Sequence, residues 1–210
     1  MLKDYNQSLD RLLAWIALVG IATVIVTHFI GSLVVDEHDF IADTISELGI
    51  KEKAWIQDLG LDALALSYAC IGIYFFRNKA LWFANSLLTP LLVTSAFIAG
   101  GVLLYFIAEH NQYANRPGRG ESIHVYLVTG FYLTTSIAML LLGYFTRATS
   151  TFRRSLPRAF CWVFILMAPP FFFMPDHIDG LYEKVVAIFL LAYLIYLLLK
   201  IKQREEHLTL

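Results

Sequence analysis

The sequence predicts an all-α membrane protein in which six transmembrane helices form a single polytopic bundle. Hydrophobic residues make up 58% of the 210 positions and charged residues only 16%, whereas charged residues are about a quarter of a typical soluble domain. The charged residues leave long apolar runs untouched, and each run is near the roughly 20 residues that a helix needs to cross a bilayer. We therefore treat residues 1–210 as one integral-membrane domain and expect no nucleic-acid partner.

Six apolar runs bounded by charged residues give the approximate positions of the spans. The first run is too long for the core of a signal peptide and no small-residue cleavage site follows it, so we expect a transmembrane helix there. The third run contains Pro90 and the pair Gly100-Gly101, which predicts a kink or a tilt. The fifth run is short and ends at Pro169-Pro170, which predicts a broken end. The predicted spans are 11–35, 55–76, 80–108, 123–145, 159–174 and 181–201.

The distribution of Lys and Arg predicts the orientation of the bundle, because the loops on the cytoplasmic side of a membrane carry an excess of basic residues. Eleven of the 16 basic residues fall in the N-terminal segment, the loops at 77–79 and 146–158, and the C-terminal tail. These segments share one side of a six-span chain, so both termini are expected in the cytoplasm. The predicted location is the inner (cytoplasmic) membrane, with the first loop outside.

Histidine and acidic residues gather in the predicted outer half, and the rule for basic residues does not explain this outer cluster. Ionisable residues within a span usually face the bundle interior and serve a function. The candidates that lie deepest or open a span are His28, Asp62, His124 and Glu183. Five of the six histidines belong to the cluster, namely His28, His38, His110, His124 and His177.

Each candidate also has a structural interpretation. His28 could hydrogen-bond a Ser or Thr of a neighbouring helix. Asp58, four residues before Asp62 on the same helical face, could simply stabilise the positive N-terminus of the second span. His124 and Glu183 open their helices and admit both interpretations. The hypothesis of a functional site depends on the observation that five spans each contribute a His or a carboxylate at a similar depth in the membrane.

The first outer loop contains the segment Asp43–Gly49, which predicts a short interfacial helix. Thr44 and Glu47 have the spacing of a capping box, and Gly49 is suited to end the helix. In one interpretation this helix only closes the bundle. In the other, Asp43, Ser46 or Glu47 reaches into the outer cluster as a ligand or an acid/base group.

The same residues carry a resemblance to a known family. The chain resembles an uncharacterised prokaryotic integral-membrane family, domain of unknown function 998, with Lys184 where that family usually has arginine. The resemblance covers most of the chain and implies a six-helix membrane fold but no activity; a more distant likeness is to Frag1-type lipid-remodelling proteins. The matching features are His28 in the first helix, Ser46-Glu47-Leu48-Gly49 in the loop, Ser122-Ile123-His124, and Gly180-Leu181-Tyr182-Glu183-Lys184 at the start of the last helix.

The leading functional hypothesis is a metal-dependent hydrolase or transferase that acts on a membrane lipid or a lipid-linked substrate from the outer leaflet. In this hypothesis His28 and His124 hold Zn²⁺ or another divalent ion, which lowers the pKa of a bound water. Arg116 and Arg119 bind a phosphate head group. The sequence contains no short metal motif such as HExxH, so the ligands would come from several helices. The candidate catalytic residues are Ser46, Glu47, Asp62 and Glu183.

Two other classes of function remain open at this point. In a proton- or solute-coupled transporter the same residues would form a relay, although the inner half of the chain has few acids or histidines to continue it. In a non-catalytic membrane sensor the outer histidines would respond to pH.

Overall fold

The computed structural model confirms the all-α fold class with six membrane-spanning helices and a short helix in the first long loop. It describes residues 2–36, 38–83, 87–110, 119–146, 151–175 and 177–209, and within these residues it contains no strand longer than an isolated bridge. The six long helices are α1 (Leu2–Val34), α3 (Ala54–Arg77), α5 (Leu88–His110), α6 (Arg119–Phe145), α7 (Thr151–Met167) and α8 (Asp179–Thr209). The short ones are α2 (Ile45–Leu48), α4 (Lys79–Trp82) and the 3₁₀ helix η2 (Pro169–Phe173).

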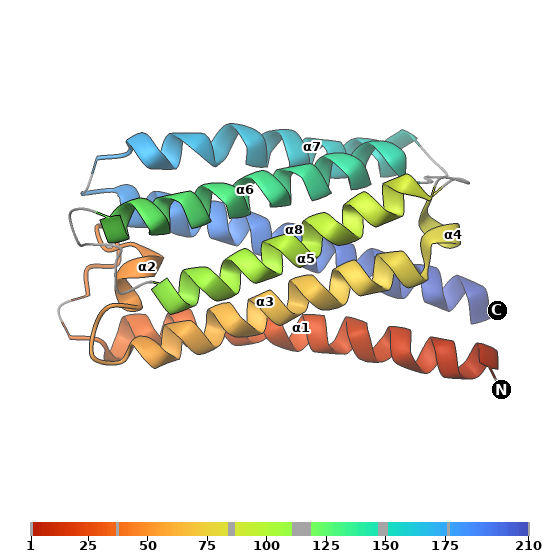
Figure 1. Ribbon diagram of the computed structural model, residues 1–210, viewed down its shortest axis with the longest axis horizontal. Coiled ribbons are helices and arrows are strands. Elements are labelled where there is room, and N and C mark those ends of the chain that lie inside the picture. Colours follow the sequence, from red (N-terminus) through yellow and green to blue (C-terminus); the bar gives the residue numbers. More distant parts are fainter. Residues whose placement is uncertain are drawn as a thin grey trace.

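The long helices form a ring in which each packs against the next one along the chain. Helices α1, α3, α5, α6 and α7 lie side by side in this order, and α8 lies behind them and returns to α1 (Figure 1). Helix α8 packs much more lightly on α1 and α7 than α1 packs on α3. Both termini lie at one end of the ring, here called the terminal end, and α2 lies at the other, the α2 end (Figure 1).

The observed helices correct the start of the third predicted span and bear out the break predicted in the fifth. The third predicted span starts too early, because residues Lys79–Trp82 form the separate helix α4 and α5 begins only at Leu88. Pro90 therefore lies in the first turn of α5, where its missing N–H interrupts no helical hydrogen bond and requires no kink. In the fifth span the predicted break is confirmed, since α7 ends at Met167 and η2 follows at the proline pair.

Small residues allow the helices on the α1–α3–α5 side to approach closely. A Cβ atom added to Gly101 of α5 would lie 2.7 Å from the carbonyl oxygen of Ala65 in α3. A Cβ atom on Gly20 of α1 would overlap the side chain of Ser67, whose hydroxyl donates to Ala17 O at 3.0 Å. Close backbone approach at Gly and Ser is typical of helix packing in membranes. The Gly100-Gly101 pair thus serves contact between helices.

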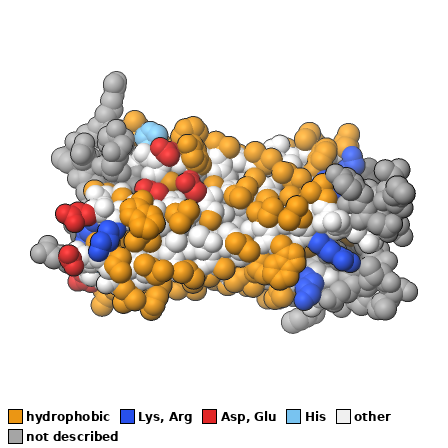
Figure 2. Space-filling view, turned by 90° about the horizontal axis from the view of Figure 1, so that it is seen from below, with side chains coloured by type: hydrophobic (Ala, Val, Ile, Leu, Met, Phe, Trp, Pro, Cys, Tyr) orange, Lys and Arg blue, Asp and Glu red, His pale blue; other side chains and the backbone are white. Residues whose placement is uncertain are grey.

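The surface of the bundle has the character of a membrane protein. Many large apolar side chains are exposed along the helices, and hydrophobic atoms form much of the face between the two ends (Figure 2). On this face acidic side chains gather toward the α2 end, whereas Lys and Arg are found at both ends (Figure 2). The chain is a multi-pass membrane protein, and the cytoplasmic location of its termini remains a prediction.

Candidate functional site

Helix α2 is held in place by the predicted capping box. The hydroxyl of Thr44 accepts from Glu47 N at 3.2 Å, and the Glu47 carboxylate accepts from Thr44 N. Gly49 ends the helix as predicted. Leu48 is fully buried, so this single turn of helix is anchored on both its polar and its apolar side. The interpretation of Glu47 as a cap is therefore confirmed, and the cap uses one of its carboxylate oxygens.

The loop that precedes α2 is fastened by the side chain of Asp43. Its Oδ2 atom accepts from Lys51 Nζ at 2.8 Å and from Asp39 N at 3.1 Å, and lies 3.1 Å from His38 Nδ1. Burial acts to raise the pKa of Asp43, but the hydrogen bonds from Lys51 and Asp39 outweigh it and hold that pKa below its ordinary value. Burial, reinforced by Lys184 and Lys51, lowers the pKa of His38 despite the neighbouring Asp43 carboxylate, and favours its neutral form.

The same loop is fastened to the start of α8. Lys184 Nζ donates to the carbonyl oxygen of Asp43 at 2.6 Å, and Leu181 N donates to that of Ile41 at 2.8 Å. Gly180 lies directly against this loop, where a Cβ atom would be 2.7 Å from Ala42 O and closer still to Asp43 O. The last helix is thus joined to the first loop by contacts that leave no room for a side chain at position 180.

Two further side chains connect α2 to the bundle. The carboxylate of Glu183 in α8 accepts from Ile45 N, the first residue of α2. The ring of His124 in α6 is hydrogen-bonded to the hydroxyl of Ser46, with 3.0 Å between Nε2 and Oγ. Ser46, His124 and Glu183 are all buried. Residues far apart in the sequence therefore meet at α2, as the hypothesis of an outer cluster predicted.

Beneath α2 the ring of helices encloses a cavity of about 280 Å³. Its walls come from α1, α3, α5, α6 and α8, and apolar side chains such as Leu64, Leu104, Phe131 and Leu190 form most of its lining. The polar lining residues gather near the α2 end. The cavity is therefore largely apolar, with an apolar floor and a few polar residues at the end nearest α2, here called its roof. The roof is formed by His28, Ser46, Gln57, Glu183 and Lys184.

Two side chains of the roof have polar atoms without a hydrogen-bond partner in the described part of the chain. Gln57 is only 1% exposed, and neither its Oε1 nor its Nε2 atom is hydrogen-bonded. The same holds for both ring nitrogens of His28, which lies next to Gln57. Even a bond between these two residues would leave one atom of each unsatisfied. Buried polar atoms are nearly always paired in folded proteins, so these four atoms mark a place for another molecule.

The cavity reaches the lateral surface of the bundle between α1 and α8. Four of its lining residues are also exposed on the outside, Ile25 and Phe29 of α1, Ile188 of α8, and Phe40 of the loop before α2. Phe29 is 63% exposed and Ile188 is 65% exposed. Since α1 and α8 contact each other only lightly and these exposed residues are apolar, lipid chains would have access to this side of the cavity in a membrane.

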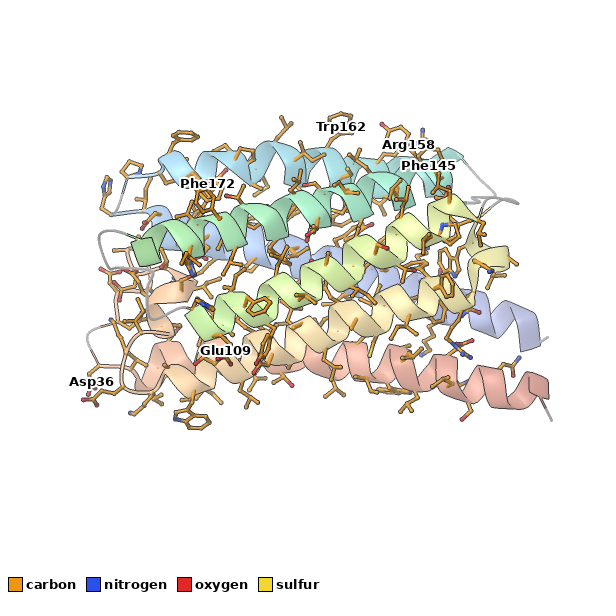
Figure 3. All side chains as sticks on the ribbon, in the orientation of Figure 1. Asp36, Glu109, Phe145, Arg158, Trp162 and Phe172 are labelled. Atoms are coloured by element: carbon orange, nitrogen blue, oxygen red, sulfur yellow. The ribbon has the colours of Figure 1, made fainter. Side chains whose placement is uncertain are left out.

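The structure brings together some of the predicted site residues and separates others. His28, Ser46 and Glu183 line the cavity, and His124 is joined to it through Ser46. Asp62 does not line it, because its side chain lies on the exposed face of α3. Asp36 and Glu109, two further acidic residues of the predicted outer half, also lie outside the cavity, and Asp36 lies at the α2 end with its side chain directed away from the bundle (Figure 3).

The assignment of metal and phosphate ligands remains a prediction. Among the described residues there is no group of three or more His, Cys, Asp or Glu side chains that could hold a metal ion. Binding of Zn²⁺ or another divalent ion by His28 and His124 stays a prediction. The side chains of Arg116 and Arg119 lie outside the described residues.

Gln57 is the residue that the sequence interpretation missed. It occupies the first turn of α3, one position before Asp58. The sequence interpretation considered the charged Asp58 and not the neutral Gln57. A polar side chain in an apolar run, on the face opposite to an exposed Trp55 and Leu59, was the available signal.

Comparison with known proteins places the chain in a family without adding an activity. Residues 17–200 match the family model described as "Protein of unknown function (DUF998)". No curated protein and no solved structure matches the chain.

Proposed function

For this chain, which belongs to the domain of unknown function 998 family, we propose that the cavity binds a membrane lipid or lipid-linked amphiphile. The polar group of the ligand hydrogen-bonds with Gln57 and His28. An apolar chain lies on the floor of the cavity, and the ligand enters sideways between α1 and α8. With the predicted orientation of the helices, the ligand comes from the outer leaflet.

The observation that carries this proposal is the unpaired amide of Gln57. Leaving a buried hydrogen-bonding group without a partner costs about 1–3 kcal/mol, which a fold would avoid by placing Leu or Met there. Gln57 can donate and accept at once, and so can an imidazole ring such as that of the neighbouring His28. A hydroxyl, ester or amide group of a lipid would satisfy these atoms.

The shape of the cavity supports an amphiphile over a fully polar solute. Its volume of about 280 Å³ is near the lower limit for small-molecule pockets, roughly 300 Å³. This space accommodates one polar group and part of an acyl or prenyl chain, while the remainder extends through the lateral opening. The described polar lining residues all gather near one end, which favours binding at that end over passage through the bundle.

The test compares lipid retention in matched variants. Wild type, Gln57→Leu and Gln203→Leu are purified in mild detergent, and bound lipid is quantified by native mass spectrometry. Gln203 is exposed near the C-terminal end of α8, so its variant controls for the same chemical change away from the cavity.

Wild type and Gln203→Leu should retain about one lipid each. Gln57→Leu should bind it on the order of tenfold more weakly, because a ligand group left without its buried hydrogen-bond partner costs about 1–3 kcal/mol and about 1.4 kcal/mol corresponds to tenfold. Equal retention by all three proteins, or no retained lipid in wild type, would refute the proposal.

A further inference from the structure

The pair formed by Ser46 and His124 has the geometry of a nucleophile and its base. The Ser46 hydroxyl lies 3.0 Å from His124 Nε2, although the two residues are 78 positions apart in the chain. Ser46 also lines the cavity, so the residue borders the space that a ligand would occupy. The His124 Nδ1 atom is buried and has no hydrogen-bond partner within the described residues.

The surroundings hold this pair rigidly. Ser46 lies in the single turn of α2, which the capping box, the Glu183–Ile45 hydrogen bond and the buried Leu48 keep in place. A serine hydroxyl is a weak nucleophile unless a nearby base takes its proton, and a histidine within about 2.6–3.2 Å can do so. A hydrogen bond needed only to dock α2 would not require Ser46 to border the cavity.

Resting on the proposed function, we infer that Ser46 and His124 are catalytic residues for acyl transfer from an ester-bearing lipid bound in this cavity. As Ser46 Oγ forms a bond to the ester carbonyl carbon, its proton moves to His124 Nε2. The ester C–O bond then breaks, and His124 returns the proton to the departing alcohol oxygen. The acyl chain is left as an ester on Ser46.

The second half of the reaction releases the acyl chain. Water, or the hydroxyl of a second lipid, attacks the acyl carbon and gives its proton to His124, which passes it to Ser46 Oγ as the serine ester breaks. The products are a free acid or a new ester. During both halves the carbonyl oxygen gains negative charge, and the amide of Gln57, unpaired in the same cavity, is a donor that can stabilise it.

A fluorophosphonate probe tests this inference, because an activated serine attacks its phosphorus, fluoride leaves, and the serine is converted to a phosphonate ester. Wild type, Ser46→Ala, His124→Gln and the control Ser32→Ala are incubated with the probe in detergent, and adducts are mapped by peptide mass spectrometry. Ser32 is matched to Ser46 in residue type, but its hydroxyl donates to His28 O within its own helix.

We expect one adduct, at Ser46, in wild type and Ser32→Ala, and none in Ser46→Ala. His124→Gln should react at least about 100-fold more slowly, in line with the loss of a general base. If His124→Gln does not fold, the labelling rate of wild type is measured at several pH values instead. This rate should fall when acid protonates the imidazole of His124. The lipid retention of Ser46→Ala should remain, which separates binding from chemistry.

Wild-type protein that retains lipid but shows no adduct at Ser46 would overturn the inference and leave the proposed binding function intact. Labelling of Ser46 that is equally fast without the imidazole, or independent of pH, would also overturn it, since His124 would then serve only to hold α2.

Discussion

Replacing Gly180 by alanine should loosen the α2 end of the protein. The new Cβ atom would lie 2.7 Å from Ala42 O and closer to Asp43 O, and backbone atoms cannot yield as a flexible side chain does. If the loop moves, it loses the hydrogen bond from Leu181, worth about 0.5–1.5 kcal/mol, and that from the charged Lys184, worth about 1.5–3 kcal/mol. The gain from replacing a helical glycine by alanine, about 0.5–1 kcal/mol, offsets only part of this.

The expected net loss is therefore about 1–4 kcal/mol, which corresponds to a fall in Tm of roughly 2–16 °C for a chain of this length. Thermal unfolding in detergent measures the loss, and hydrogen exchange should show faster exchange in residues 41–46. Gly130→Ala is the matched control, since its Cβ atom would meet only the methyl groups of Leu103 at 3.4 and 3.5 Å. A Gly180→Ala protein as stable as Gly130→Ala, with unchanged exchange, would refute the reasoning.

Three further predictions follow from the same contacts. Lipid-free Gln57→Leu should be more stable than lipid-free wild type by about 1–3 kcal/mol, measured as Tm, because it removes an unsatisfied buried amide; a lower Tm would contradict this. Acidification from pH 7.5 to 5.5 should lower the hydrogen-exchange protection factors of residues 38–44, so that exchange becomes faster relative to the intrinsic rate, which itself falls in acid. Because folding lowers the pKa of His38, the unfolded loop binds a proton as the pH falls below about 6.5 and the folded loop does not, so the folded loop becomes less stable. The lowered pKa of Asp43 stabilises the folded loop at all pH values above 3.8, and this stabilisation is lost only in stronger acid. Single cysteines at positions 42 and 150 should be labelled from opposite sides of the membrane, with position 150 cytoplasmic; labelling from the same side would overturn the predicted topology.

The features that depend on neighbouring residues could be predicted from the sequence. The capping box of Thr44 and Glu47 is a local arrangement, and the structure reproduces it in full. The number of spans and the break at Pro169-Pro170 likewise depend on runs of adjacent residues. Such features need no knowledge of how the helices are arranged in space.

The composition of the cavity could be predicted only in part, because it depends on which face each helix turns inwards. Asp58 and Asp62 are one helical turn apart, but the face of α3 that carries Asp62 is exposed, whereas Gln57 points into the cavity. The prediction favoured the aspartates because a charged side chain in an apolar run is a stronger sign of a functional site than a neutral amide. The partnership of Ser46 with His124 required the path of the chain around the whole ring.

The placement of a lipid chain inside the ring can be measured by photo-cross-linking. A phospholipid with a diazirine at the end of one acyl chain is incorporated into bilayers with the protein, and the labelled residues are mapped after irradiation. The account predicts adducts on the cavity floor, at Leu64, Phe131 or Leu190, and their reduction in Gln57→Leu. Adducts confined to outward-facing residues such as Leu166, which is exposed on α7, would contradict the proposal that this protein holds a lipid within its bundle.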